Sequence, residues 1–168
     1  MPHAATPAVA ALLAVAALLA AGVPHEVVKF EYDPRDRSFG DQAVEALTHT
    51  EGLAPGQIFK TLVLSTPTGN AVAVLPVPAR LSLKSAAAAL GVGRAEMADP
   101  GVAQKSTGYV VGAISPLGQR KGLPTVIDST ALSWGRMYCS AGRRGWDVAI
   151  APQDLIRLTG AVTAAIQA

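Results

Sequence analysis

The spacing of apolar and polar positions changes along this chain, and the spacings predict both strands and helices. Alternation combined with β-branched residues predicts strands over 26–31, 58–65, 71–76, 125–128, 136–140 and 146–150. A short turn at 66–70 separates the second strand from the third, so this pair should form a hairpin. A compact β-branched run over 107–111 also predicts a strand, which breaks at Gly112.

Helices are expected where apolar stretches carry capping residues at their ends. The first begins with Thr6 as N-cap and Pro7 at the first helical position, and it ends before Gly22. Others are expected over 41–48, 82–90, 100–107 and 152–159, and the last continues over 161–167 after Gly160. Because strands and helices follow no regular order, the sequence predicts an α+β fold, one domain over 1–168, with a mixed and strongly bent sheet.

The apolar run over 8–23 has a composition that signal peptides share. The segment before it contains no Lys or Arg, and the run is shorter than the ~20 residues that span a bilayer. The helix-capping residues around it favour a helix of a soluble domain. We therefore expect a cytoplasmic protein with no membrane partner.

Composition narrows the class of protein. Half of the 168 residues are apolar and 15% are charged, which indicates a globular chain with its own core. The net charge of +2 is unevenly distributed: 1–51 is acidic, whereas 101–147 contains more bases than acids. This asymmetry indicates a basic face that could contact a phosphate backbone, although scattered solvating charges would give the same count.

Conventional catalytic groups are missing from the pattern. Cys139 is the single cysteine, so no intrachain disulfide forms, and its position within a strand favours a buried thiol over a nucleophile. The three histidines lack metal-ligand spacing, so we expect no metal and no cofactor. No serine lies in a Gly-x-Ser-x-Gly turn with a His–Asp pair to activate it.

The stretch TGYVVGAISPLG (107–118) is the most distinctive part of the chain. Glycine at 112 permits unusual backbone angles, and the compact residues Ala113, Ile114 and Ser115 before Pro116 carry free backbone N–H groups. Such a loop can direct several N–H donors at a carbonyl that becomes an oxyanion. A plain turn between two strands would have the same composition.

Four motifs together resemble a known family: EMADP (96–100), STGY (106–109), GAISPLG (112–118) and LPTVID (123–128). They resemble the YbaK-type (YbaK/EbsC) free-standing aminoacyl-tRNA deacylases, in the branch that acts on Cys-tRNA(Pro). The resemblance runs from about Thr6 to the end of the chain. It implies an α+β fold like the editing domain of prolyl-tRNA synthetase, with a barrel-like sheet flanked by helices.

The resemblance assigns roles to residues that would otherwise have plainer interpretations. Lys60 in FKTL (59–62) shares an apolar face and could simply extend to solvent, but it matches the family's key lysine. Asp147 and Ser140 in SAGRRGWD (140–147) match pocket residues, although a turn carboxylate and a strand-end serine are also ordinary. Phe30 and Phe39 match pocket aromatics and could equally be core residues, and the relatives carry tyrosine at the position of Phe30.

The implied function is hydrolysis of mischarged Cys-tRNA(Pro), in which the thiol of the cysteine attacks its own ester. Lys60 and the backbone of 112–115 would stabilise the carbonyl, while Pro116, the two aromatics, Ser140 and Asp147 shape the pocket. Candidate contacts to the tRNA phosphates are Lys105, Arg120, Lys121, Arg143 and Arg144. The resemblance also implies a transient complex with prolyl-tRNA synthetase. Rival interpretations are a deacylase for another amino acid, such as alanine on tRNA(Pro), and a non-catalytic module that binds tRNA or the synthetase.

Overall fold

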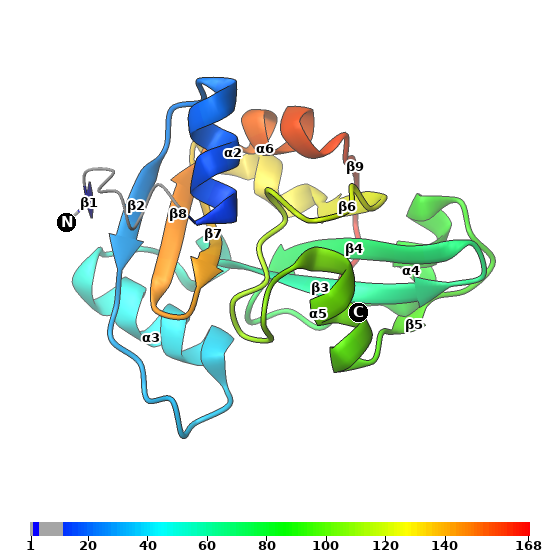
Figure 1. The fold of residues 1–168 in the computed structure, drawn as a ribbon, viewed down its shortest axis with the longest axis horizontal. Helices are drawn as coiled ribbons and strands as arrows, with labels where there is room; N and C mark the ends of the chain where they lie inside the picture. The colour runs from blue at the N-terminus through cyan, green and yellow to red at the C-terminus, as the bar shows by residue number, and fades with distance from the viewer. Residues whose placement is uncertain (1, 4–11) are drawn as a thin grey trace.

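The computed structural model describes residues 2–3 and 12–168, which form a mixed α+β fold with two sheets (Figure 1). One sheet has four strands in the spatial order β1 (Pro2–His3), β2 (Glu26–Lys29), β8 (Trp146–Ile150) and β7 (Met137–Arg143). The other has five, in the order β5 (Glu96–Met97), β3 (Phe59–Thr66), β4 (Gly69–Pro76), β6 (Thr125–Asp128) and β9 (Val162–Ala164).

Two helices cover opposite faces of the four-stranded sheet. Helix α2 (Leu13–Ala21) packs Val15 and Leu18 into the core that contains Cys139 and Val148. Helix α3 (Phe39–Thr50) packs Ala43 and Leu47 against a second cluster, which includes Val28, Tyr138 and Ala149. Because successive side chains of a strand point to opposite faces, both faces of this sheet are buried.

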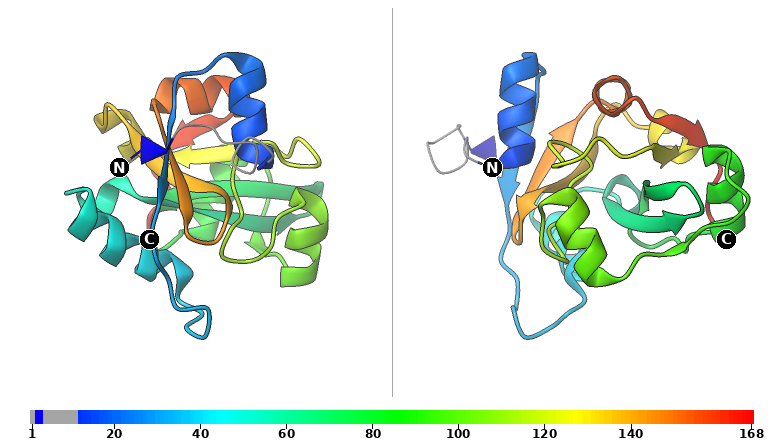
Figure 2. Two further views of the ribbon diagram at one scale, coloured as in Figure 1. Left: turned by 60° about the vertical axis from the view of Figure 1, so that its left-hand side comes forward. Right: turned by 45° about the vertical axis from the view of Figure 1, so that its right-hand side comes forward.

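The five-stranded sheet also has buried side chains on both faces, and Figure 2 shows the fold from two further sides. Helix α4 (Leu83–Leu90) packs its alanines against Leu64, Leu75 and Val126. Helix α6 (Pro152–Thr159) contributes Leu155 to the core that the two sheets share. The remaining elements are α5 (Pro100–Thr107) and two short 3-10 helices, η1 (Pro55–Gln57) and η2 (Ser129–Ser133).

The expected single barrel-like sheet is wrong. The described strands form two sheets, and neither sheet closes on itself. A single bridge between Ile58 and Tyr138 connects the start of β3 to β7. Beyond this bridge the strands separate, and side chains from both sheets fill the shared core. The hairpin of β3 and β4 is confirmed, with Lys60 opposite Leu75 and Val63 opposite Val72.

Two expected elements are replaced by others. The strand expected over 107–111 does not form: Thr107 ends α5, and the N–H groups of Tyr109 and Val111 bond to the side chains of Thr107 and Gln104. The helix expected over 161–167 is instead strand β9, because Gly160 adopts a φ of 66° and ends α6. The chain then runs parallel to β6, where Thr163 pairs with Ile127.

Helix α2 ends at the expected glycine, and an aspartate anchors the C-terminal end of the chain. The expected N-cap Thr6 and Pro7 lie outside the described residues, while Gly22 ends α2 with a φ of 66°, as expected. At the other end Asp128 anchors the chain by accepting hydrogen bonds from Ile166 N–H and the Gln167 side chain. Burial alone would raise the pKa of Asp128, but these bonds and those from Thr130 outweigh it and lower the pKa.

Helices long and apolar enough to cross a bilayer do not occur in 2–3 or 12–168.

Candidate active site

A cavity of about 360 Å³ lies where the edge of β3 faces the hairpin of β7 and β8. Strand β5 pairs with β3 only at Leu64 and Ser65, so the first half of β3 borders the cavity. The other walls are the end of β2, the start of α3, the start of α5 and the loop that follows α5. The volume lies within the roughly 300–1,000 Å³ that is typical of small-molecule sites.

Lys60 reaches the cavity from β3 and is half-buried. Its Nζ donates hydrogen bonds to the carbonyl oxygens of Val77, at 3.1 Å, and Ala79, at 2.7 Å. Burial lowers the pKa of Lys60, and the charge of Asp41 partly opposes this. An ammonium has three donors, so one remains for a ligand. The arrangement suits stabilisation of a developing negative charge.

Asp147 faces the same cavity from β8 and is 5% exposed. Burial raises the pKa of this carboxyl to about 7. It pairs in register with Val28 of β2 and Ser140 of β7, so three strands fix its position. Ser140 also lines the cavity, and its Oγ accepts a hydrogen bond from Gly142 N–H at 3.1 Å. A buried carboxylate can bind an ammonium group of a ligand once it is ionised.

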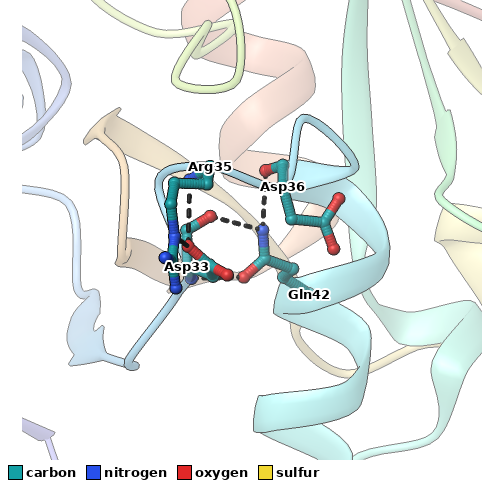
Figure 3. Close-up of polar contacts among 4 residues, drawn as sticks. All are labelled: Asp33, Arg35, Asp36 and Gln42. Carbon is teal, nitrogen blue, oxygen red and sulfur yellow. Dashed lines mark hydrogen bonds and ion pairs between the residues drawn. The ribbon is translucent and has the colours of Figure 1, made fainter.

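Phe30 and Phe39 form the aromatic wall of the cavity. Phe30 N–H donates to Gly145 O at 2.8 Å, which holds the end of β2 against the β7–β8 turn. The segment between the two aromatics is fixed by Gln42, whose side chain bonds to the backbone of Asp33 and Asp36 (Figure 3). The segment between Phe30 and Phe39 therefore helps to fix the positions of the two rings.

The loop over 109–118 brings Val111 and two of the expected oxyanion-site residues to the cavity. Gly112 and Ile114 line it, whereas Ala113, Ser115 and Pro116 are buried and are not among the described residues that line it. Ala113 N–H donates to Val110 O at 3.0 Å, so it is already used within the loop. The sequence had suggested a row of N–H donors from 112 to 115, but the structure brings only Gly112 and Ile114 to the cavity wall.

Side chains hold this loop from two directions. Within the loop, the buried hydroxyl of Tyr109 donates to Leu117 O, and Ser115 Oγ accepts a hydrogen bond from Leu117 N–H at 3.2 Å. From the β7–β8 turn, Arg144 donates to Val111 O through Nε at 3.0 Å and Nη2 at 2.6 Å. Figure 1 shows this loop running beside the tip of the β7–β8 hairpin. The loop conformation thus depends on contacts from distant parts of the sequence.

The five expected phosphate contacts fall into three groups. Lys105, Arg120 and Lys121 are exposed near the end of α5, where Arg120 N–H donates to Thr107 O. Arg143 is exposed and lines the cavity. Arg144 is half-buried, and its guanidinium points inward to Val111 O. The structure therefore brings only Arg143 of the five to the cavity.

Among the lining residues that the sequence had not indicated, Arg37 contributes a guanidinium and Thr61 a hydroxyl. Arg37 is exposed there, with its guanidinium 5.1 Å from the Phe39 ring centroid. Thr61 follows Lys60 and is 9% exposed, and within the described part of the chain its Oγ1 has no hydrogen-bond partner. The place of Thr61 beside Lys60 in the motif FKTL was the available signal. Arg37 had no signal beyond its position two residues before Phe39.

The described residues offer neither an activated protein nucleophile nor a metal site. Cys139 is fully buried, and burial raises the pKa of its thiol far above the usual range. The described residues contain no group of three or more His, Cys, Asp or Glu that could hold a metal ion. Hydroxyls of Ser140 and Thr61 are the only serine or threonine hydroxyls on the described cavity wall, and no histidine accompanies them there to act as a base.

Comparison with known families identifies the class of domain. Residues 41–158 match the model of the aminoacyl-tRNA editing domain, which covers most of the chain and every cavity wall except the end of β2 and the Arg37–Gly40 segment. The chain belongs to the aminoacyl-tRNA editing domain family.

Individual relatives agree with this assignment. The editing domain is 35% identical over 138 residues to an Enterococcus faecalis protein named "Putative Cys-tRNA(Pro)/Cys-tRNA(Cys) deacylase EbsC", covering 82% of this chain and 81% of that protein. Its fold is similar to a solved structure described as a "putative trans-editing enzyme for prolyl tRNA synthetase", with a TM-score of 0.81, 24% identity, and 98% and 99% of the two chains covered. A solved hypothetical protein gives a TM-score of 0.76 at 24% identity, over 90% and 96% of the chains.

Proposed function

We propose that this editing domain is a trans-editing hydrolase that removes cysteine from mischarged tRNA(Pro). The observation that supports this most is the composition of the cavity: one half-buried ammonium, one buried carboxyl and an aromatic wall surround a space without an activated nucleophile among its described lining residues. The family membership and the name of the 35% identical relative support the same substrate class.

In the proposed reaction the substrate supplies the nucleophile. The thiol sulfur of the mischarged cysteine attacks its own ester carbonyl carbon, and the C–O bond to the ribose breaks. The thiol proton passes to the departing ribose oxygen, and water then opens the cyclic thioester to give free cysteine. Holding sulfur and carbonyl in a reactive geometry can contribute roughly 7–11 kcal/mol to lowering the barrier.

The lining residues have distinct roles in this proposal. Lys60 uses its remaining N–H to stabilise the carbonyl oxygen as it becomes negative, together with the backbone at Gly112 and Ile114. The ionised carboxylate of Asp147 binds the α-ammonium group of the substrate, with Ser140 beside it. Phe30 and Phe39 enclose the aminoacyl group and limit the access of water.

The basic residues bind the nucleic acid. Arg143 and Arg37, both exposed on the cavity wall, contact the 3′ end of the tRNA, while Lys105, Arg120 and Lys121 contact phosphates further along. We also propose that residues 1–168 act as one editing domain and that a transient complex with prolyl-tRNA synthetase restricts the reaction to tRNA(Pro).

The test is deacylation of Cys-tRNA(Pro), Ala-tRNA(Pro) and Pro-tRNA(Pro) side by side, with the wild type and Lys60→Ala. We expect cysteine to be removed selectively and the variant to lose at least about 100-fold in rate, the effect of removing one oxyanion donor. Selective hydrolysis of Ala-tRNA(Pro) would replace the substrate assignment. Tight tRNA binding without hydrolysis of any of the three would favour a non-catalytic binding module.

A further inference from the structure

Neighbouring arginines at the tip of the β7–β8 hairpin occupy different surroundings. Arg143 is exposed and lines the cavity. Arg144 is half-buried, and it donates two hydrogen bonds to the single carbonyl oxygen of Val111. A guanidinium committed in this way has fewer donors left for a phosphate. From the sequence both arginines were candidate phosphate contacts, but in the structure only Arg143 has an exposed side chain on the cavity wall.

Arg144 also contacts the aromatic wall. Its guanidinium carbon lies 4.3 Å from the centroid of the Phe39 ring, close enough for a cation–π interaction. Phe39 in turn packs against Gly112, since a Cβ at that position would lie 2.3 Å from the ring. Arg144 therefore contacts both the carbonyl that precedes Gly112 and the ring on which Gly112 rests.

These contacts stabilise the backbone turn at Gly112, which has an uncommon conformation. Gly112 has a φ of 88°, and it is one of the three loop residues on the cavity wall, with Val111 and Ile114. The bond from Arg144 to Val111 O fixes the peptide immediately before this turn. Three segments far apart in sequence, the start of α3, the loop and the hairpin tip, thus meet at one guanidinium.

We infer that Arg144 is a positioning residue that holds the Gly112 turn against Phe39, and thereby sets the geometry of the cavity wall, rather than a contact to tRNA phosphates. The kinetic part of this inference rests on the proposed function, and the structural part does not. Displacing reacting groups by about 1 Å can cost roughly 100-fold in rate, so loss of this support should act on kcat.

The test compares Arg144→Gln and Arg144→Lys with Arg143→Gln, and with Arg157→Gln as a control that removes a surface guanidinium from α6. We expect Arg144→Gln to lower kcat about 100-fold with little change in KM, and Arg144→Lys to recover only part because it cannot form the paired bonds. Arg143→Gln should raise KM and reduce the slope of log Kd for tRNA against log salt by about 1. Arg157→Gln should change neither.

Hydrogen exchange of the free protein provides a readout independent of the substrate. We expect faster exchange of the amides in 109–118 in both Arg144 variants and no change in Arg143→Gln. A reduced salt slope with unchanged loop exchange in Arg144→Gln would overturn the inference and restore Arg144 as a phosphate contact. Unchanged kcat with faster exchange would also overturn it. Failure of the wild type to deacylate any substrate would instead count against the proposed function, and the exchange result would still decide the role of Arg144.

Discussion

Two parts of the cavity wall are built in different ways. Lys60 and Asp147 stand on strands, where neighbouring strands pair in register on at least one side: Lys60 with Leu75, and Asp147 with Val28 and Ser140. The loop wall, residues 109–118, has no strand partner in the described residues, and individual side chains hold it instead. Many backbone hydrogen bonds therefore support the part around Lys60 and Asp147, which we call the strand wall. Only a few side-chain contacts support the loop wall.

This difference predicts how substitutions in each wall affect the cavity. Removing one side chain from a strand should remove its own chemistry and leave the neighbouring groups in place, because backbone pairing persists. Removing one contact from the loop wall should move several groups at once.

The largest effect should follow Gly112→Ala. The substitution places a Cβ 2.3 Å from the Phe39 ring at a residue whose φ is 88°, so both the loop and the aromatic wall must move. We expect a loss of about 100-fold in deacylation and a loss of roughly 1–3 kcal/mol in unfolding free energy from the strained backbone, measured by kinetics and by urea denaturation. Gly91→Ala is the matched control: its φ is 72°, and nothing lies within 4 Å of the added Cβ. It should lose stability through backbone strain alone and keep its activity, so equal activity losses in both variants would contradict the crowding argument.

The same contrast explains which parts of the molecule could be predicted from the sequence. Alternation along 58–65 and 146–150 locates β3 and β8, and with them Lys60 and Asp147, because local residue type determines a half-buried strand. The conformation of 107–111 depends on Gln104 and on Arg144, 33 residues from Val111, and local composition does not contain that information. The prediction of a helix over 161–167 was wrong for a related reason. Residues of strand β9 pair in parallel with β6, a partner remote in sequence.

A smaller effect, specific to the strand wall, concerns the pH dependence of Asp147. Its pKa in the folded protein is raised to about 7, so the folded state retains a proton that the unfolded state has released between about pH 4 and 7. Unfolding free energy should therefore fall as the pH rises through this window, and Asp147→Asn should remove that fall. If the ionised carboxylate binds the substrate ammonium, kcat/KM should rise as the pH passes about 7, and this inflection should vanish in Asp147→Asn. An unchanged inflection would assign it to another group, such as the substrate thiol.

A moderate loss of stability should follow Tyr109→Phe in the loop wall. The buried hydroxyl donates to Leu117 O, and its removal leaves that carbonyl without this donor, at a cost of about 1–3 kcal/mol in unfolding free energy. Hydrogen exchange should accelerate across 109–118 while the amides of β3 and β8 stay protected. Uniform acceleration over the whole domain would show that the loop wall does not open independently of the strands.

The smallest effect should be a gain in stability, from Thr61→Val in the strand wall. Within the described residues Thr61 Oγ1 is buried without a hydrogen-bond partner, and an unsatisfied buried hydroxyl costs about 1–3 kcal/mol. Valine keeps the shape and removes the hydroxyl, so Tm should rise by about 2–4 °C for each kcal/mol recovered. Thr125→Val is the matched control, because Thr125 is similarly buried but its Oγ1 donates to Leu123 O at 2.9 Å, and the same replacement there should lower Tm. Equal losses in the two variants would mean that Thr61 is satisfied in solution. A gain in Tm together with slower deacylation would mean that the strand wall retains an unfavourable hydroxyl beside Lys60 because the substrate uses it.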